Sequence, residues 1–249
     1  MILGCSVLTA NRIFEKTKRK IIVTGHYGSG KTEFVVSLSL LAANQLNKTR
    51  EPSPCPDVAV IDLDVINPYF RSRERRDVLS EAGVGVYGSA FDTEITAELP
   101  ALGASLRAPL ESETCKVFID LGGNDTGAIV LNQFGKYFTD DDTTVLAVIN
   151  ANRPDTGTLE GAIEHIKAIE YITKLNVSAL VNNTHMLRET AAEDIKAGHE
   201  FCKNICEITG KFLLCDCYPE GIVNPDDLID FTDDPIPLGL YMRPTWQDK

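Results

Sequence analysis

Short apolar runs alternate with amphipathic stretches along most of the chain, and this alternation predicts its secondary structure. The apolar runs are rich in β-branched residues and are bounded by Gly, Pro, Asn or Asp, which is typical of buried strands. After residue 33 the apolar spacing becomes helical, with Phe34, Leu38 and Leu41 on one face. We expect strands at 21–24, 58–61, 84–87, 115–120, 144–150, 177–181 and 212–215, and an edge strand at 238–242. We expect helices at 34–46, 73–82, 126–137, 156–174 and 189–209.

The apolar runs are continuous rather than alternating, as in Val58-Ala59-Val60-Ile61. Continuous apolarity indicates strands that are covered on both faces, as in a parallel sheet. Because strands and helices alternate, right-handed crossovers would place helices on both sides of that sheet. We therefore predict the α/β class, a three-layer α/β/α fold with a mainly parallel sheet. Residues 1–19 are expected to form a tail or leading helix, and residues 20–249 a single nucleotide-binding domain.

The first expected strand leads directly into a phosphate-binding motif, and residues 25–32, Gly-His-Tyr-Gly-Ser-Gly-Lys-Thr, are called the phosphate loop from here on. The spacing matches G-x-x-x-x-G-K-[ST] between a strand and a helix. Glycines let the backbone turn so that successive N–H groups point at an anion, and the helix N-terminus adds positive potential. Lys31 would reach the β- and γ-phosphates, and the Thr32 hydroxyl would hold Mg²⁺. The predicted nucleotide-binding residues of this segment are Gly25, Gly28, Ser29, Gly30, Lys31, Thr32 and Glu33.

Carboxylates follow two of the expected strands, at the edge where open α/β sheets bind ligands. Asp120 ends one apolar run and would hold Mg²⁺ together with Thr32. The N–H of Gly123 could contact a γ-phosphate. Asp62 and Asp64 end another run, and either could orient an attacking water, so the predicted catalytic set is Lys31, Asp62 and Asp64. The alternative for both aspartates is a turn-capping role.

Two further strand ends carry groups with a chemical and a structural interpretation. Asn182 ends the strand expected at 177–181, and its amide both donates and accepts, which suits an adenine edge. An Asx-turn role is the alternative. Cys215 and Cys217 lie on one face of the last core strand, where they are either soft metal ligands or two buried thiols.

Composition excludes several classes of protein. Apolar residues make up 43% and charged residues 24% of the 249 residues, which is ordinary for a globular domain. The net charge of −12 argues against general binding to nucleic acid or to anionic membranes. The longest apolar runs are far too short for a transmembrane helix. Seven cysteines without a disulfide-scaffold spacing, beside a nucleotide motif, predict reduced thiols and a cytoplasmic location.

The phosphate loop, the Asp62-x-Asp64 strand end and Asp120-x-x-Gly123 together resemble the MinD/ParA/CobQ-like (SIMIBI) branch of P-loop ATPases, over roughly residues 20–217. The resemblance implies a P-loop NTPase fold, Mg-ATP as ligand and, in many members, nucleotide-dependent homodimers. Many members carry an extra lysine after the first glycine of the loop, in the deviant Walker A motif. Here that position is His26, so the residue that reaches a partner's nucleotide is missing. The GTPase branch carries Asn-Lys-x-Asp where this chain has residues 182–185, Asn-Asn-Thr-His, which favours ATP over GTP.

The function predicted from these observations is a Mg-ATP-dependent ATPase that acts as a nucleotide-dependent switch or accessory factor for another protein. Two alternatives remain at this stage. An ATP-dependent kinase or ligase similar to dethiobiotin synthetase would bind an anionic substrate through Tyr69, Arg71, Arg73, Arg75 and Arg76, although a solvated helix start explains the arginines equally well. A metal-insertion or cofactor-maturation ATPase would use Cys215 and Cys217.

Overall fold

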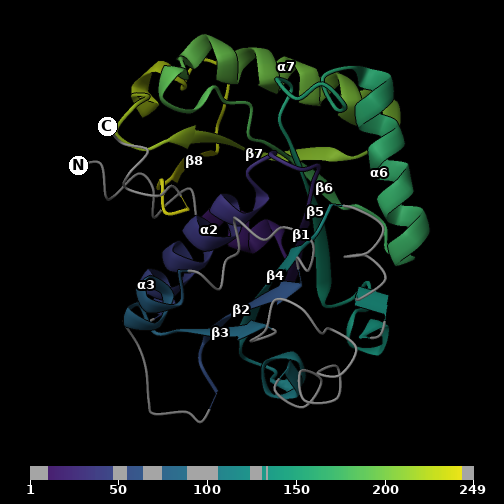
Figure 1. Cartoon of the computed structure of the whole chain (residues 1–249), viewed down its shortest axis with the longest axis vertical. Coiled ribbons are helices and arrows are strands. Elements are labelled where there is room, and N and C mark those ends of the chain that lie inside the picture. Colours follow the sequence, from purple (N-terminus) through teal and green to yellow (C-terminus); the bar gives the residue numbers. More distant parts are fainter. Residues whose placement is uncertain are drawn as a thin grey trace.

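The computed structural model describes residues 11–46, 55–63, 75–88, 106–123, 131–132 and 134–242 (Figure 1). The strands are β1 (Lys20–Thr24), β2 (Val58–Leu63), β3 (Val84–Gly88), β4 (Lys116–Leu121), β5 (Thr143–Ile149), β6 (Ala179–Asn182), β7 (Phe212–Pro219) and β8 (Pro235–Leu238). They form one eight-stranded sheet in the order β3-β2-β4-β1-β5-β6-β7-β8. Every neighbouring pair is parallel. The predicted fold class is therefore confirmed.

The helices of the described part are α2 (Lys31–Leu46), α3 (Arg76–Glu81), α6 (Leu159–Thr173) and α7 (Ala192–Thr209). Single 3₁₀ turns lie at η2 (Gly135–Tyr137), η3 (Leu187–Glu189) and η4 (Pro225–Asp227). Residues 11–16 and 106–111 are also helical. Of the helix expected at 126–137, residues 126–130 and 133 lie outside the described residues, residues 131–132 are helical, and the last three residues form η2. The edge strand expected at 238–242 lies earlier, at β8, because its pairing with β7 runs from Pro235 to Leu238.

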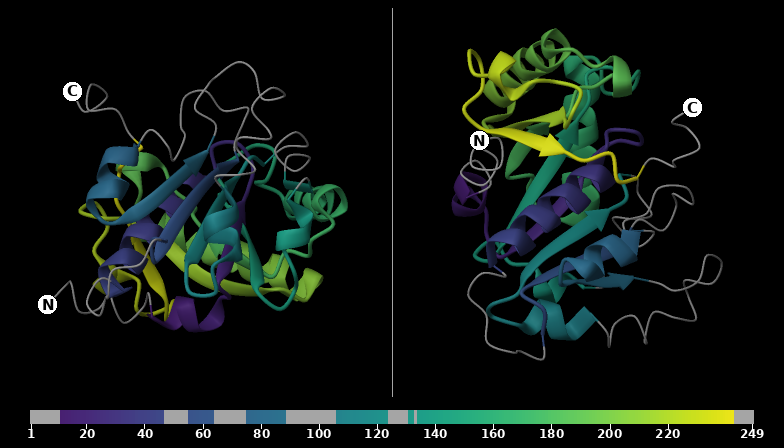
Figure 2. Two further views of the ribbon diagram at one scale, coloured as in Figure 1. Left: turned by 90° about the horizontal axis from the view of Figure 1, so that it is seen from below. Right: turned by 90° about the vertical axis from the view of Figure 1, so that its left-hand side faces the viewer.

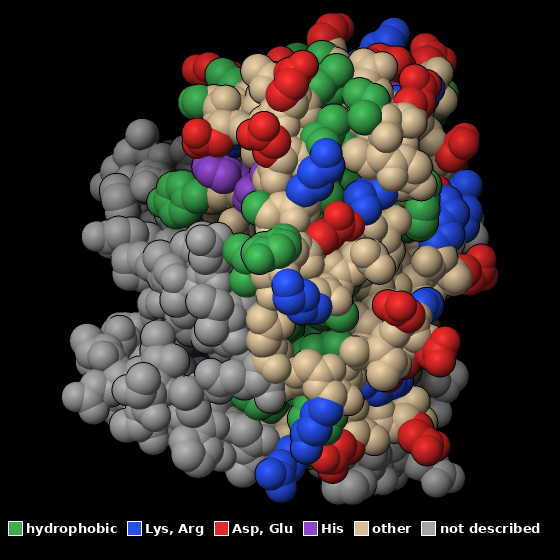
Figure 3. All heavy atoms as spheres, turned by 90° about the vertical axis from the view of Figure 1, so that its right-hand side faces the viewer, with side chains coloured by type: hydrophobic (Ala, Val, Ile, Leu, Met, Phe, Trp, Pro, Cys, Tyr) green, Lys and Arg blue, Asp and Glu red, His purple; other side chains and the backbone are tan. Residues whose placement is uncertain are grey.

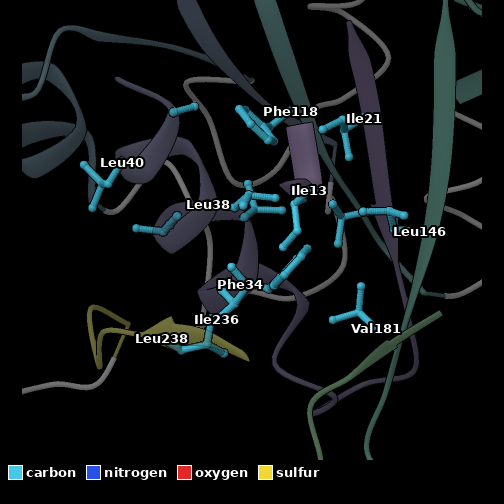
Figure 4. Close-up of a cluster of buried hydrophobic side chains, with 14 of the residues drawn as sticks. Ile13, Ile21, Phe34, Leu38, Leu40, Phe118, Leu146, Val181, Ile236 and Leu238 are labelled. Atoms are coloured by element: carbon cyan, nitrogen blue, oxygen red, sulfur yellow. The ribbon is translucent and has the colours of Figure 1, made fainter. Parts of the chain in front are cut away.

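Two apolar layers sandwich the sheet, because successive strand residues point to opposite faces. In β4, Phe118 packs into the cluster beneath α2, with Phe34 and Leu38, whereas Ile119 packs into the cluster beneath α6 and α7. Figure 4 shows the first cluster, and Figure 2 shows α2 and α6 on opposite sides of the strands. These two cores hold the three layers together.

The sheet brings the carboxyl ends of all its strands to one edge, with β1 between β4 and β5. Open parallel sheets bind ligands at that edge, where the order of connections reverses. The phosphate loop leaves β1 at this point and enters α2. The strand order therefore places the loop between the ends of β4 and β5.

Two further features concern the membrane and the charged surface. Among the described residues, we find no helix with the length and apolarity that crossing a bilayer requires. On the face that includes α6, acidic and basic side chains are interspersed over the described part (Figure 3).

Candidate functional site

The phosphate loop has the backbone geometry that its glycines require. Gly28 and Gly30 have φ values of 76° and 83°, a region that L side chains rarely adopt. The N–H of Ser29 donates to the oxygen of His26 at 3.0 Å, and the N–H of Phe34 donates to the oxygen of Gly30 at 3.0 Å. The first bond closes the loop and the second begins α2. The loop amides are therefore held in a tight concave turn before the helix N-terminus.

Neighbouring side chains pack directly against this loop. A Cβ atom on Gly30 would lie 2.2 Å from the Asn183 amide nitrogen, and a Cβ on Gly28 would lie 2.9 Å from the guanidinium carbon of Arg153. Both side chains also bond the loop backbone: Asn183 Nδ2 donates to the Ser29 oxygen at 2.7 Å, and Arg153 Nε donates to the Gly28 oxygen at 2.8 Å. The glycines are needed for close approach as well as for φ.

A cavity of about 370 Å³ opens beside the loop and α2. Its volume falls within the usual range for small-molecule sites. One side carries polar groups and the loop backbone, and the other is apolar. The lining residues are Tyr27, Gly28, Gly30, Lys31, Thr32, Glu33, Arg153, Asn183, His185, Leu187, Pro219, Leu238, Leu240 and Met242. Such a cavity has a cationic end suited to phosphates and an apolar end suited to a flat ring.

Lys31 and Thr32 lie at the base of this cavity, as the motif predicts. They are the first two residues of α2, and both are more than nine-tenths buried. Ser29 is also buried, and its hydroxyl oxygen has no hydrogen-bond partner among the described residues. An orphaned buried hydroxyl, a glycine cradle and a buried lysine fit a bound Mg-triphosphate. The residues present are therefore compatible with the predicted ligand.

The apolar wall of the cavity is held by Glu33. The N–H groups of Tyr241 and Met242 donate to the two carboxylate oxygens of Glu33 at 2.7 and 3.0 Å. The Gly239 N–H donates to the Ser37 hydroxyl at 3.2 Å. Burial raises the pKa of Glu33 to about 7, although these backbone hydrogen bonds oppose the shift. Glu33 lines the cavity, and its carboxylate fixes the chain that follows β8; its contact with a nucleotide stays a prediction.

His185 lies at the polar side of the cavity as a neutral imidazole. Burial, with a smaller effect of the nearby Arg153 charge, lowers its pKa to about 4. The Leu187 N–H donates to its Nδ1 at 3.3 Å, so Nδ1 is the acceptor and the ring proton is assigned to Nε2. Nε2 lies 3.5 Å from the position of a Cβ on Gly30. His185 therefore offers a neutral N–H donor toward the loop.

Asp62 and Asp120 meet on the neighbouring strands β2 and β4. They are directly opposite in the register, and both are buried. Because Val60 and Phe118 two residues earlier face α2, the two carboxylates point to the α2 face as well. Asp64 lies outside the described residues. The structure thus brings Asp62 and Asp120 together on β2 and β4, of which β4 pairs with β1, but neither residue lines the cavity. Their predicted roles stay predictions.

Gly123, two residues after the end of β4, lies against the phosphate loop. A Cβ atom on Gly123 would lie only 1.8 Å from the backbone oxygen of Gly25. Only glycine fits such an approach of two backbones. Gly123 is consequently placed at the loop, where its predicted contact with a phosphate would have to occur.

Asn182 and Asn183 occupy different positions from those expected. Asn182 is fully buried, donates to the Ile195 oxygen at 2.9 Å and to Asp216 Oδ1 at 2.7 Å, and accepts the Thr184 N–H at 3.1 Å. Asp216 also bonds His199 Nδ1 at 2.9 Å. Asn182 thus belongs to a buried network with α7 and does not line the cavity. Asn183 lines the cavity instead, because successive side chains along the chain here point in opposite directions.

His26 turns away from the cavity, toward α6. Its Nε2 lies 3.4 Å from Asp155 Oδ2, and its ring makes an edge contact with His165 at 5.4 Å between centroids. Burial and the proximity of His26 lower the pKa of His165 to about 4. The residue at the position of the extra lysine is therefore engaged within its own chain.

Cysteines of β7 and arginines near α3 are the residues on which the alternative functions depend. Cys215 and Cys217 are buried in the core cluster beneath α2, and burial raises the pKa of the Cys217 thiol. Within the described ranges, no group of three or more His, Cys, Asp or Glu is arranged to hold a metal ion. Arg75 and Arg76 begin α3, while Tyr69, Arg71 and Arg73 lie outside the described residues.

Sequence reasoning missed Arg153, Asn183, His185 and the segment after β8. The turn that contains Arg153 follows an apolar strand at the ligand edge, and that signal could have marked it. The segment after β8 has no motif, and its role depends on contacts with α2.

No family model matches the sequence, and no curated protein matches it. Solved structures of similar fold include FtsY from Mycoplasma mycoides, with a TM-score of 0.52 and 15% identity, and the cell division protein FtsY from Thermotoga maritima, with 0.53 and 17%. Each match covers 78% of this chain but only 58% and 59% of those chains. FlhF complexed with GTP and Mg²⁺ matches with a TM-score of 0.50 and 16% identity, over 82% of this chain and 67% of that one. At these identities the likeness shows the fold, which is that of P-loop nucleoside triphosphatases.

Proposed function

We propose that this protein binds Mg-ATP in the cavity beside the phosphate loop, hydrolyses it, and acts as a nucleotide-dependent switch for another protein. The observation that carries the proposal is the position of Lys31 and Thr32. Both are buried and line a cavity of about 370 Å³ beside a glycine loop. The carboxylates of Asp62 and Asp120 do not line the cavity, but they end the paired strands β2 and β4 at the same edge of the sheet. This arrangement supplies cations and N–H donors for phosphates, and oxygen ligands for a metal, at one edge of the sheet.

The residues would divide the chemistry between them. Lys31 and the amides of the phosphate loop would stabilise negative charge on the transferred phosphoryl group. Thr32 and Asp120 would hold Mg²⁺, which when bound neutralises phosphate charge. Asp62 would orient the attacking water from the neighbouring strand, and Asp64 is the other candidate for that role. Gly123 would donate its N–H to the γ-phosphate.

The far end of the cavity would receive the base. Leu240 and Met242 offer an apolar surface, while Asn183 and His185 offer polar groups beside the loop. Glu33 is the one carboxylate among the described lining residues, and both its oxygens accept backbone N–H groups. Guanine recognition commonly requires a carboxylate that accepts from the base, so the lining favours adenine. GTP, the ligand in the FlhF structure, is the competitor to test.

The switch role and a cytoplasmic client are parts of the same proposal. The contacts of His26 with Asp155 and His165 favour a switch that does not depend on a lysine donated by a second copy. Homodimers formed by other surfaces remain compatible with it.

Calorimetry with Mg-ATP and Mg-GTP tests the proposal. We expect saturable binding of Mg-ATP, tighter than that of Mg-GTP, and slow phosphate release. Lys31→Ala should abolish both, and Lys167→Ala, on the exposed face of α6, is the matched control. Absence of binding by the native protein to either nucleotide would contradict the proposal. Turnover that requires a small metabolite would instead favour the kinase or ligase alternative.

A further inference from the structure

One charged side chain at the cavity has a role that neither the motif nor the fold assigns. Arg153 lies in the turn between β5 and α6, and its Nε donates to the Gly28 oxygen at 2.8 Å. Its guanidinium lies against the glycine, with Cζ at 2.9 Å and Nη2 at 3.2 Å from where a Cβ on Gly28 would be. A side chain at position 28 would displace it. The loop and the arginine therefore fit each other.

The turn fixes the backbone of Arg153 before any ligand arrives. The N–H of Arg153 donates to the Asn150 oxygen at 3.2 Å, and the Thr156 N–H donates to the Arg153 oxygen at 3.2 Å. The Asn150 side chain accepts the Asn152 N–H at 3.0 Å. With both backbone groups and Nε bonded, the guanidinium would lose little further freedom on binding a ligand.

Most of the hydrogen-bonding capacity of Arg153 is directed at no protein group in the part of the chain that the structure describes. Of the N–H donors that guanidinium carries, only the one on Nε has an acceptor among the described residues. The carboxylate of Glu33, on the same cavity, is taken by the backbone of Tyr241 and Met242. His185 is kept neutral nearby, so Arg153 and Lys31 are the cations of this lining. Arg153 is a half-buried cation in a protein with a net charge of −12. Its remaining N–H donors, which have no acceptor among the described residues, are suited to an anionic ligand.

We propose that Arg153 is a phosphate-binding residue, which clamps the phosphate chain of the nucleotide against the loop from within the same subunit. The inference rests on the proposed function, because it needs the phosphates at the loop. The planar guanidinium presents parallel N–H groups that match two oxygens of a phosphate, a match that lysine lacks. Lys31 would approach the phosphates from α2 and Arg153 from the turn after β5.

A purely structural role for Arg153, holding the turn to Gly28, makes a different prediction. Loss of that bond would weaken the loop and lower the affinity for every ligand of the cavity alike. A phosphate-binding role instead makes the loss grow with the number of phosphates. It also makes the affinity less sensitive to salt once the charge is removed.

The test compares Arg153→Gln and Arg153→Lys with the native protein by calorimetry, using Mg-ATP, Mg-ADP and AMP at two salt concentrations. Arg107→Gln, an exposed arginine, is the matched control. We expect Arg153→Gln to bind Mg-ATP roughly ten- to one-hundredfold more weakly, as loss of charge-assisted hydrogen bonds implies. The loss should be smaller for Mg-ADP and least for AMP, and Arg153→Lys should fall between.

Two outcomes would overturn the inference while leaving the proposed function intact. One is Mg-ATP binding by Arg153→Gln equal to that of the native protein, and the other is an equal loss for all three nucleotides. Thermal melting of each variant separates a folding defect from a binding defect, and Arg153→Lys retains a cation if the glutamine variant unfolds. If neither the native protein nor Arg107→Gln binds any of the three nucleotides, the proposed function itself is contradicted. That result differs from the two above, in which the native protein binds Mg-ATP.

Discussion

The side-chain amide of Asn183 donates a hydrogen bond of 2.7 Å to the backbone oxygen of Ser29, which ties the end of β6 to the phosphate loop. The two residues are 154 positions apart in the sequence, and Asn183 is almost fully buried. A loop with three glycines has high conformational entropy when free. This bond therefore helps to hold the loop amides in their concave arrangement.

Replacing Asn183 should weaken nucleotide binding through the loop. In Asn183→Ala the buried Ser29 oxygen loses its donor, which costs about 1–3 kcal/mol, and Asn183→Asp adds repulsion between two oxygens. We expect both variants to bind Mg-ATP more weakly, the aspartate variant more so, in titration calorimetry. Asn204→Ala, at an exposed position of α7, serves as control. Unchanged affinity in Asn183→Asp would show that the loop keeps its shape without this bond.

Alanine at position 30 should be far more damaging than an ordinary glycine substitution. The φ of 83° disfavours any L side chain, and the new Cβ would lie 2.2 Å from the Asn183 amide. Strain of this kind costs on the order of 1–3 kcal/mol before the displacement of Asn183 is counted. We expect Gly30→Ala to lower the melting temperature and abolish binding, whereas Gly135→Ala, with open space at its Cβ, should do neither. A Gly30→Ala protein that binds Mg-ATP normally would contradict the geometry.

Glu33 predicts a pH dependence of stability. Its pKa in the folded protein is about 7 against an ordinary value of 4.5, so the folded state binds this proton more tightly than the unfolded state. The stabilisation is fully present below about pH 4.5 and is lost as the pH rises through about 7, by on the order of 2–3 kcal/mol. Denaturant melts between pH 4.5 and 8 should show this loss in the native protein and in the exposed control Glu160→Gln.

The variant Glu33→Gln isolates the effect. A glutamine cannot titrate, and its amide offers only one oxygen to the N–H groups of Tyr241 and Met242. Because glutamine stays uncharged, the variant should not show the loss seen in the native protein, and its stability should vary less between pH 4.5 and 8. An identical pH slope in Glu33→Gln and the native protein would show that another group titrates.

The paired aspartates should separate binding from hydrolysis. If Asp120 holds Mg²⁺, Asp120→Asn should reduce both the Mg²⁺ dependence of nucleotide affinity and turnover. If Asp62 orients water, Asp62→Asn should retain Mg-ATP affinity and lose turnover. Binding by calorimetry and phosphate release on the same samples distinguish the two. The reverse pattern would exchange the roles, and full activity in both variants would exclude the pair from catalysis.

Much of the fold could be predicted because it depends on local patterns. Continuous apolar runs such as Val58–Ile61 indicate strands covered on both faces, and the helices between them require a parallel sheet. The placement of Asp62 and Asp120 followed from the same logic, since strand ends meet at one edge. The exact ends of strands were harder to predict. The strand expected at 212–215 extends to Pro219 in β7, because its pairing with β8 continues that far.

Asn182 was predicted at the nucleotide, but Asn183 lines the cavity, which shows where prediction from sequence stops. Both amides follow the same apolar run, and a strand's alternation sends them to opposite sides. Which side is the cavity depends on how α7 and Asp216 enclose the end of β6. The pairing of β6 with β7 also shifts register between Leu180 and Val181, which no local pattern marks.

The sequence by itself determined the phosphate loop and its place between a strand and a helix, because the glycine spacing, Lys31 and Thr32 lie in a segment that is contiguous in the chain. The tertiary structure alone decided what surrounds that loop. Asn183 and Arg153 bond its backbone, and the Glu33 carboxylate accepts the backbone N–H groups of Tyr241 and Met242. These are contacts between residues far apart in sequence, and only the packing of the strands brings them together.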